Sequence, residues 1–309
     1  MFSKVVRKRS GAKWHGKHRP YDGRPRSGAQ KPYRARGQLL YGYHVIHTLL
    51  KQAAHSPGRG RRPTRELHRL FMQGGREETR QERTVYLAAE AAQVDVVRLP
   101  KAALNDMLGT RRTHNGFVLD AEPIEPVKAT TDDILSRAGS HEVGGRCPLV
   151  IALDEIHDVQ NLGGILRSVG YLFGDTVPIL SSKNCAPLSP AASSASAGAL
   201  EFLYAKGALL HAIKPLPTVL KELRGSGFQI IGTGYDDKGV MRPLETLSLD
   251  GPMCIVMGNE HRGMRTNISR ECDEHVFIGR ADSAPEELDS LNVSAAATVF
   301  LSRLSDHGA

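Results

Sequence analysis

The sequence has little cysteine and no long hydrophobic run. Its four cysteines lie far apart in 309 residues and form no CxxC pair, which excludes a zinc knuckle and a disulfide scaffold. We therefore expect free thiols in a reducing cytoplasm and no metal site. The longest apolar run, residues 148–153, is far too short to cross a bilayer, and no apolar segment follows the basic N-terminus, so no membrane partner is expected. At 40% hydrophobic and 24% charged residues, the composition fits a soluble chain that forms two domains with buried cores.

Acidic residues are almost absent from the first 36 positions. This segment has one acid, Asp22, against twelve Lys and Arg side chains, whereas the other 273 residues hold 29 basic and 32 acidic groups. No helical or strand period fits residues 1–36, and their apolar surface is too small to offset the entropy of ordering. We expect a disordered basic arm that binds RNA phosphates, with a few rings that stack on unpaired bases. A solubilising tail is the alternative.

Residues 37–122 show the pattern of a small α/β domain. The pattern predicts, in order, a helix over 43–50, a helix over 64–72, another helix after 77–79, a strand or helix at 85–87, a strand at 94–97, a helix over 101–108 and a closing strand at 116–119. A basic cluster interrupts it, at Arg59, Arg61, Arg62, Arg65 and Arg69. RNA contact and an ordinary solvated face explain this cluster equally well.

Residues 148–309 alternate strand and helix after a linker over 123–147, which holds one short predicted helix at 132–138. The predicted strands are 149–153, 177–180, 228–232, 254–257 and 276–278, and the predicted helices are 162–173, 190–199, 217–223, 266–272 and 292–304. This order predicts an open, mostly parallel sheet with helices on both faces. Ligands of such sheets bind outside the carboxyl ends of the strands.

Three segments follow predicted strands and carry candidate site residues. In the first, Arg167 lies on a helix beside Gly163, Gly164 and Gly170, and so many helical glycines indicate close approach of a backbone or a ligand. The second segment is a glycine-bracketed loop over 258–263, and the third is the helix entry at 289–294. Each has an ordinary structural alternative: a surface arginine, a loop ion pair and a serine N-cap.

Together and in this order, the three segments resemble the motifs of the SpoU (TrmH-like) family of RNA ribose 2′-O-methyltransferases, within the SPOUT superfamily. The first motif corresponds to Asn161-Leu162-Gly163-Gly164-Ile165-Leu166-Arg167 with Gly174, the second to Val256-Met257-Gly258-Asn259-Glu260-His261-Arg262-Gly263-Met264, and the third to Ser290-Leu291-Asn292-Val293-Ser294. The small-residue segment 194–199 is also similar, and residues 37–119 resemble the substrate-binding domain that often precedes this fold.

The resemblance implies a C-terminal domain with a deep trefoil knot, bound S-adenosylmethionine and a homodimeric site. It assigns cofactor binding to Gly258, Ile278 and Leu291, and the surroundings of the reacting ribose to Asn161, Arg167, Glu260, Ser290 and Asn292. It implies no metal, because the sulfonium is already a strong methyl donor. A guanidinium is not deprotonated in ordinary sites, so we interpret Arg167 as an electrostatic stabiliser of the developing alkoxide. A phosphate, water and Glu260 stay open as proton acceptors.

The loop before the third motif departs from the family pattern. Ile278-Gly279-Arg280 and an acidic stretch over 282–289 replace the usual Ile-Pro-Met and short link, and His261 replaces a glycine. The leading hypothesis is 2′-O-methylation of structured RNA, tRNA or rRNA. The alternative is an RNA-binding protein of the same fold with weakened or lost methyl transfer. A protein or small-molecule methyltransferase is disfavoured by the basic arm.

Overall fold

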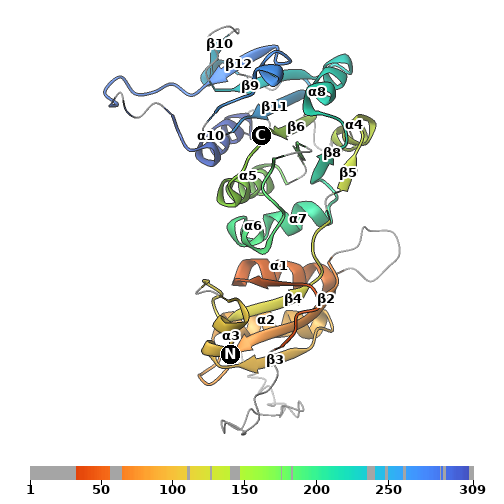
Figure 1. Cartoon of the computed structure of the whole chain (residues 1–309), viewed down its shortest axis with the longest axis vertical. Coiled ribbons are helices and arrows are strands. Elements are labelled where there is room, and N and C mark those ends of the chain that lie inside the picture. Colours follow the sequence, from red (N-terminus) through yellow and green to blue (C-terminus); the bar gives the residue numbers. More distant parts are fainter. Residues whose placement is uncertain are drawn as a thin grey trace, which may run out of the picture. The chain divides into compact units, whose positions relative to one another are not determined.

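A computed structural model (Figure 1) describes residues 33–55, 65–109, 112–125, 127–139, 147–174, 176–181, 184–234, 241–247, 250–259, 262–285, 287 and 290–305. The first 32 residues, which make up nearly all of the basic arm, lie outside the described residues, as do Arg59, Arg61 and Arg62 of the basic cluster. None of the helices in the described ranges combines the length and the apolar character that a bilayer crossing requires.

The first part of the fold is a four-stranded sheet with three helices. Its strands are β1 (Gln38–Tyr41), β2 (Leu67–Gln73), β3 (Val96–Leu99) and β4 (Phe117–Ala121), in the spatial order β1-β4-β2-β3. Its helices are α1 (Tyr43–Ala54), α2 (Arg80–Ala91) and α3 (Lys101–Met107). Pairs that involve β4 are antiparallel, and β2 and β3 are parallel. Side chains of α1 and α2 pack with one face of the sheet in the larger of two apolar cores, and α3 contributes to the smaller core.

The predicted helix over 64–72 is wrong, because this segment contains strand β2. Leu, Met and Arg favour helices when isolated, yet Leu70, Phe71 and Met72 are buried in a strand that pairs on both sides. Tertiary pairing therefore overrides local propensity. Residues 85–87 belong to α2, whose first turn is fixed by a capping box between Thr79 and Glu82. The predicted strand at 116–119 is confirmed as β4, which lies between β1 and β2 in the sheet. Strand β1 was not predicted.

A buried carboxylate fixes the chain just before β1. Asp120 of β4 accepts hydrogen bonds from the Tyr33 hydroxyl at 2.6 Å and from the backbone N–H groups of Arg36 and Gly37 at 2.8 and 2.9 Å. The ring of Tyr33 also meets Phe71 edge-on, with 4.6 Å between centroids. Tyr33 and Arg36, which the prediction assigned to the disordered arm, are therefore hydrogen-bonded to the sheet.

The second part is an eight-stranded sheet in which every pair is parallel, as predicted (Figure 1). Its spatial order is β10-β12-β9-β11-β6-β7-β8-β5. The strands are β5 (Val127–Ala129), β6 (Leu149–Leu153), β7 (Val177–Leu180), β8 (Leu210–Ala212), β9 (Gln229–Thr233), β10 (Met241–Pro243), β11 (Met253–Met257) and β12 (Glu274–Phe277). Three of them, β5, β8 and β10, were not predicted; each is three residues long and lies at or near an edge of the sheet.

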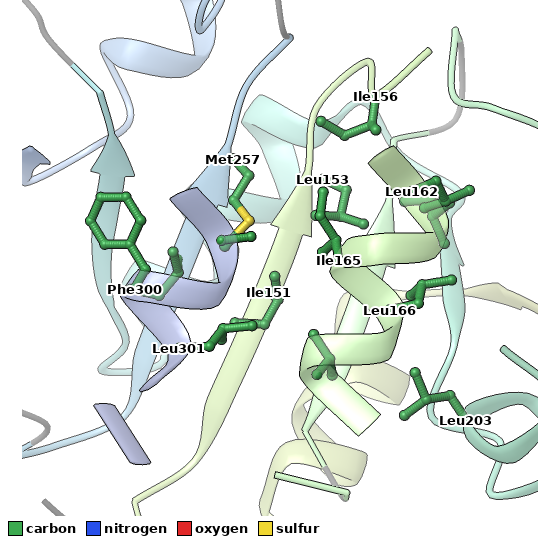
Figure 2. Close-up of a cluster of buried hydrophobic side chains, with 14 of the residues drawn as sticks. Ile151, Leu153, Ile156, Leu162, Ile165, Leu166, Leu203, Met257, Phe300 and Leu301 are labelled. Carbon is green, nitrogen blue, oxygen red and sulfur yellow. The ribbon is translucent and has the colours of Figure 1, made fainter. Parts of the chain in front are cut away.

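Helices cover both faces of this sheet, also as predicted. They are α4 (Thr131–Gly139), α5 (Val159–Leu172), α6 (Pro190–Ala195), α7 (Ala199–Ala205), α8 (Leu216–Gly225), α9 (Thr266–Ser269) and α10 (Val293–Ser305), with a 3₁₀ turn at Leu244–Thr246. Figure 2 shows one of the two cores, where Ile151 and Leu153 of β6 point toward α5 and α10. The alternate residues Val150 and Ala152 belong to the opposite core with α4, α8 and α9. The knot that the resemblance implies stays a prediction.

The predicted helix over 190–199 is two helices. Ala197 and Gly198 have φ values of 51° and 90°, which end α6 before α7 begins. A Cβ on Gly198 would lie 2.8 Å from the Thr48 hydroxyl oxygen of α1, so the break also makes room for that helix. The predicted linker likewise contains regular structure: its short helix is confirmed as α4, and β5 pairs with β8.

Candidate functional site

The candidate site lies at the carboxyl ends of β6 and β11, where the parallel sheet places ligand sites. The chain leaves β6 through Asp154 and Glu155 and enters α5, whose N-cap Asp158 accepts a hydrogen bond from the Gln160 N–H at 2.7 Å. Because β6 and β11 pair in register from Leu149 to Leu153, the loops that follow them emerge side by side.

Small residues bring α5 against its neighbours. A Cβ on Gly163 would overlap the Cβ of Ala195 in α6, and one on Gly164 would lie 2.9 Å from the Cβ of Ser294 in α10. A Cβ on Gly170 would lie 3.2 Å from that of Ala199 in α7. Of the two predicted reasons for these glycines, the described contacts support close approach of another helix.

Two asparagines join the first and third motifs. The Asn292 side-chain amide donates a hydrogen bond to the side-chain oxygen Oδ1 of Asn161 at 2.9 Å. The side-chain oxygen Oδ1 of Asn292 accepts from the Ser294 N–H at 2.9 Å, from the Ser294 hydroxyl at 2.7 Å and from the Ala295 N–H at 3.4 Å, so it caps α10. Asn292 therefore positions the start of α10 and orients Asn161 at once.

A pocket of about 450 Å³ opens beside this pair. It is lined by His157, Asp158, Asn161, Ser290, Leu291, Asn292 and Val293. Four of the predicted site residues thus come together in this pocket: Ser290, Leu291 and Asn292, and also Asn161, which precedes them by some 130 positions in sequence. Leu291 keeps 54% of its surface exposed, so the pocket offers an apolar side chain beside amide groups. Sequence reasoning missed His157 and Asp158 as site residues; their place directly before the first motif was the available signal.

The other predicted residues do not line this pocket. Arg167 is exposed on α5, six residues or about 9 Å of helix rise beyond Asn161. Ile278 follows β12 and packs against the core that Figure 2 shows. Gly258 directly follows β11, and a Cβ there would lie 2.8 Å from the backbone of Gly263 and Met264, so this position admits only glycine without a shift of the loop. Glu260 lies outside the described residues.

An ion-pair network links the chain after β6 to the chain after β11. The Arg265 guanidinium binds both carboxylate oxygens of the fully buried Asp154, with 3.0 Å from Nε to Oδ2, and its Nη1 lies 3.1 Å from Glu155 Oε1. The hydrogen bond to Asp154 raises the pKa of Arg265. Asn184, after β7, donates to Glu155 at 3.0 Å. Among the described residues, no group of three His, Cys, Asp or Glu side chains is placed to hold a metal.

Two known domain families match this chain. Residues 148–302 match the "SpoU rRNA Methylase family", and residues 39–127 match "RNA 2'-O ribose methyltransferase substrate binding".

Named relatives are RNA methyltransferases. The "23S rRNA (guanosine-2'-O-)-methyltransferase RlmB" of Pseudomonas syringae pv. tomato is 30% identical over 266 residues, which cover 85% of this chain and 93% of the relative. "rRNA methyltransferase 1, mitochondrial" of Dictyostelium discoideum is 27% identical over 237 residues and 69% of this chain, and the chain spans 43% of that relative's length. The protein of the same name from Saccharomyces cerevisiae is 30% identical over 64% of this chain, which spans 56% of that relative.

Solved structures share the fold. The SpoU methyltransferase AviRb from Streptomyces viridochromogenes, crystallised in complex with AdoMet, superposes with a TM-score of 0.60 at 21% identity, covering 87% of this chain and 89% of AviRb. An AdoMet-bound rRNA methyltransferase from Sinorhizobium meliloti gives a TM-score of 0.60 at 19% identity, with 87% of each chain covered.

Proposed function

The chain belongs to the SpoU rRNA methylase family, and from this membership we propose that it transfers a methyl group from S-adenosylmethionine to a ribose 2′-oxygen of RNA. The observation that carries the proposal is the hydrogen bond between Asn161 and Asn292, which joins the first and third family motifs at one pocket. An incidental likeness of short motifs would not require residues 131 positions apart to meet.

The pocket has the chemistry that a nucleoside cofactor needs. The exposed apolar side chain of Leu291 stands beside the polar groups of Asn161 and Ser290, and sites for such molecules combine apolar surface with a few oriented polar groups. We propose that Leu291 contacts the cofactor in this pocket, and that Ile278 and Gly258, which lie outside the pocket lining, hold the cofactor as the family motifs imply. When bound, S-adenosylmethionine supplies a sulfonium-activated methyl group, and the chain's own residues position the 2′-oxygen.

Arg167 requires a second copy of the chain in this proposal. Its side chain is exposed and does not line the pocket of its own chain. Tyr171, one helical turn further along α5, is 89% exposed, and Val299 of α10 is 41% exposed. We propose a homodimer across this face, in which Arg167 of one copy stabilises the developing alkoxide at the pocket of the other. Glu260 belongs to the same proposed site through the second motif.

The first test is a comparison of ribosomal RNA from cells with and without the gene, in which 2′-O-methylated positions are mapped. Ribosomal RNA is the proposed substrate because a relative of which this chain spans 93% acts on 23S rRNA by name, and tRNA in the same samples is the comparison. At least one position that loses its methyl group without the gene, and regains it with purified protein and S-adenosylmethionine, supports the proposal. An unchanged methylation map contradicts it.

The role of Arg167 has its own test. We expect Arg167→Ala to abolish methyl transfer while the affinity for S-adenosylmethionine stays near that of the parent, because the proposed role of Arg167 is at the reacting ribose oxygen and not at the cofactor. Arg167→Lys is the matched variant, since it keeps the charge and loses the planar donor pair. Undiminished turnover of the alanine variant would remove Arg167 from the mechanism.

The second candidate function is RNA binding without transfer, and the acidic 282–289 stretch favours it. Calorimetric titration with S-adenosylmethionine separates the two candidates. Saturable binding supports the enzyme, whereas no heat up to millimolar cofactor supports the binder. In either case the arm is expected to supply electrostatic affinity, so deletion of residues 1–32 should flatten the salt dependence of RNA binding and leave cofactor binding unchanged.

A further inference from the structure

His157 is an exposed histidine in the wall of the pocket that no motif assigns to a role. Its neighbours in sequence fix its position, because Ile156 is fully buried in the core and Asp158 caps α5. The exposed His157 therefore lines the pocket together with Asn161 and Asn292.

The second motif determines which ring nitrogen of His157 carries a proton. Asn259 has a fixed amide orientation: its side-chain N–H group donates to the Glu155 carbonyl at 2.9 Å, and its side-chain oxygen accepts from the Arg262 N–H at 3.1 Å. The same amide nitrogen of Asn259 lies 3.4 Å from His157 Nδ1. Because an N–H donor faces Nδ1, Nδ1 accepts, and the neutral ring carries its hydrogen on Nε2.

The distal Nε2–H group of His157 has no hydrogen-bond partner among the described residues. It is thus a donor at the rim of a pocket, attached to a ring whose other nitrogen is already held. RNA offers oxygen acceptors on every phosphate and ribose. Resting on the proposed function, we propose that His157 contacts the substrate by donating its Nε2–H to an RNA oxygen beside the reacting ribose. The same tautomer leaves Nε2 without a lone pair for the ribose proton, so His157 is a substrate-binding donor and not the proton acceptor.

The proposal is tested with ribosomal RNA from cells lacking the gene. Two variants are compared: His157→Phe keeps a flat ring without a donor, and His157→Gln keeps an amide N–H donor at a similar reach. For His157→Phe we expect KM for RNA to rise about tenfold, the size of one lost hydrogen bond, with kcat within about twofold of the parent. His157→Gln should recover most of the loss. Because a neutral donor releases no counterion, the salt slope of RNA binding should not change.

Controls separate this role from a structural one. Ser226→Phe places the same ring on an exposed residue of the region that matches the methylase family, away from the pocket lining, and it should leave KM unchanged. Urea midpoints of all variants should match the parent. An unchanged KM in His157→Phe overturns the proposal, and so does a fall in kcat that His157→Gln does not recover, which would instead indicate proton transfer. If the parent shows no methyl transfer, the proposed function fails, and the dissociation constant for the same RNA still decides the role of His157 through the same pair of variants.

Discussion

Asp120 and Glu201 are two solvent-inaccessible carboxylates whose pKa values shift in opposite directions. Asp120 lies in the small sheet and is 0% exposed, and Glu201 lies in α7 and is 1% exposed. Burial acts to raise the pKa of Asp120, but hydrogen bonds from Tyr33, Arg36 and Gly37 outweigh it and the pKa is lowered. The pKa of Glu201 is raised, because burial outweighs the attraction of Arg65.

The difference lies in the donors. Three donors within 2.9 Å surround Asp120, whereas the nearest Arg65 nitrogen is 4.0 Å from Glu201, and neither carboxylate oxygen of Glu201 has a hydrogen-bond partner among the described residues. Burial sets how much an unpaired charge costs, and donor geometry decides whether that cost is offset. The Arg65–Glu201 ion pair also links the part of the chain with the four-stranded sheet to the part with the eight-stranded sheet. Arg65 precedes β2 of the first sheet, and Glu201 belongs to α7, which packs with the second.

The largest expected effect comes from Arg65→Met. It leaves the Glu201 carboxylate buried without a counter-charge, and we expect a loss of about 4 kcal/mol of unfolding free energy at pH 8. The folded-state pKa of Glu201 is raised, so its ionisation lowers stability as pH rises from about 4.3, its unfolded value, through the raised value. The loss should therefore be smaller at pH 5. Urea denaturation at the two pH values measures it.

The double variant Arg65→Met with Glu201→Met is the control. Replacing both partners removes the uncompensated charge, and we expect stability within about 1 kcal/mol of the parent. If the double variant is as unstable as Arg65→Met alone, the ion pair contributes more to the unfolding free energy than its 4.0 Å separation indicates.

A somewhat smaller effect is expected for Asp120→Ala, which leaves three part-buried donors without their acceptor. We expect a loss of about 3 kcal/mol at pH 7, measured by urea denaturation, and a smaller loss for the matched Asp120→Asn, which retains one acceptor oxygen. The folded-state pKa of Asp120 is lowered. The extra unfolding free energy of the parent over Asp120→Ala is therefore present above about pH 3.9, and it disappears as the pH falls through the folded-state pKa. An advantage that persists at pH 2 would contradict this assignment.

The smallest effect on stability is expected at the candidate site, for Asn292→Asp. The carboxylate keeps the cap of α10 and is favoured near a helix N-terminus, so unfolding free energy should change by less than about 0.5 kcal/mol. The aspartate carboxylate cannot donate a hydrogen bond to Asn161, so we expect the rate of methyl transfer to fall about tenfold. Asn292→Ala, which loses both functions, should also lower stability by about 1 kcal/mol. Equal activity in the parent and the aspartate variant would limit Asn292 to capping.

The predictions from sequence succeeded where a segment's pattern had one interpretation. Strand β6 is a continuous apolar run, and α5 carries apolar residues at helical spacing, so both were placed correctly. The pattern failed where pairing decided the outcome, as in β2, whose residues also suit a helix, and in the three-residue strands, which are too short to carry a period. The break between α6 and α7 depends on a close approach by Thr48 that local sequence does not encode.

The sequence by itself determined the family motifs, the α/β order and the position of the glycines, because these follow from residue type and spacing along one chain. Only the tertiary structure decided that Asn161 and Asn292 share a hydrogen bond, that His157 faces the pocket with a fixed tautomer, and that Arg167 lies outside it. The physical reason is that directional contacts between segments more than a hundred residues apart depend on strand register and helix packing, which no local pattern specifies.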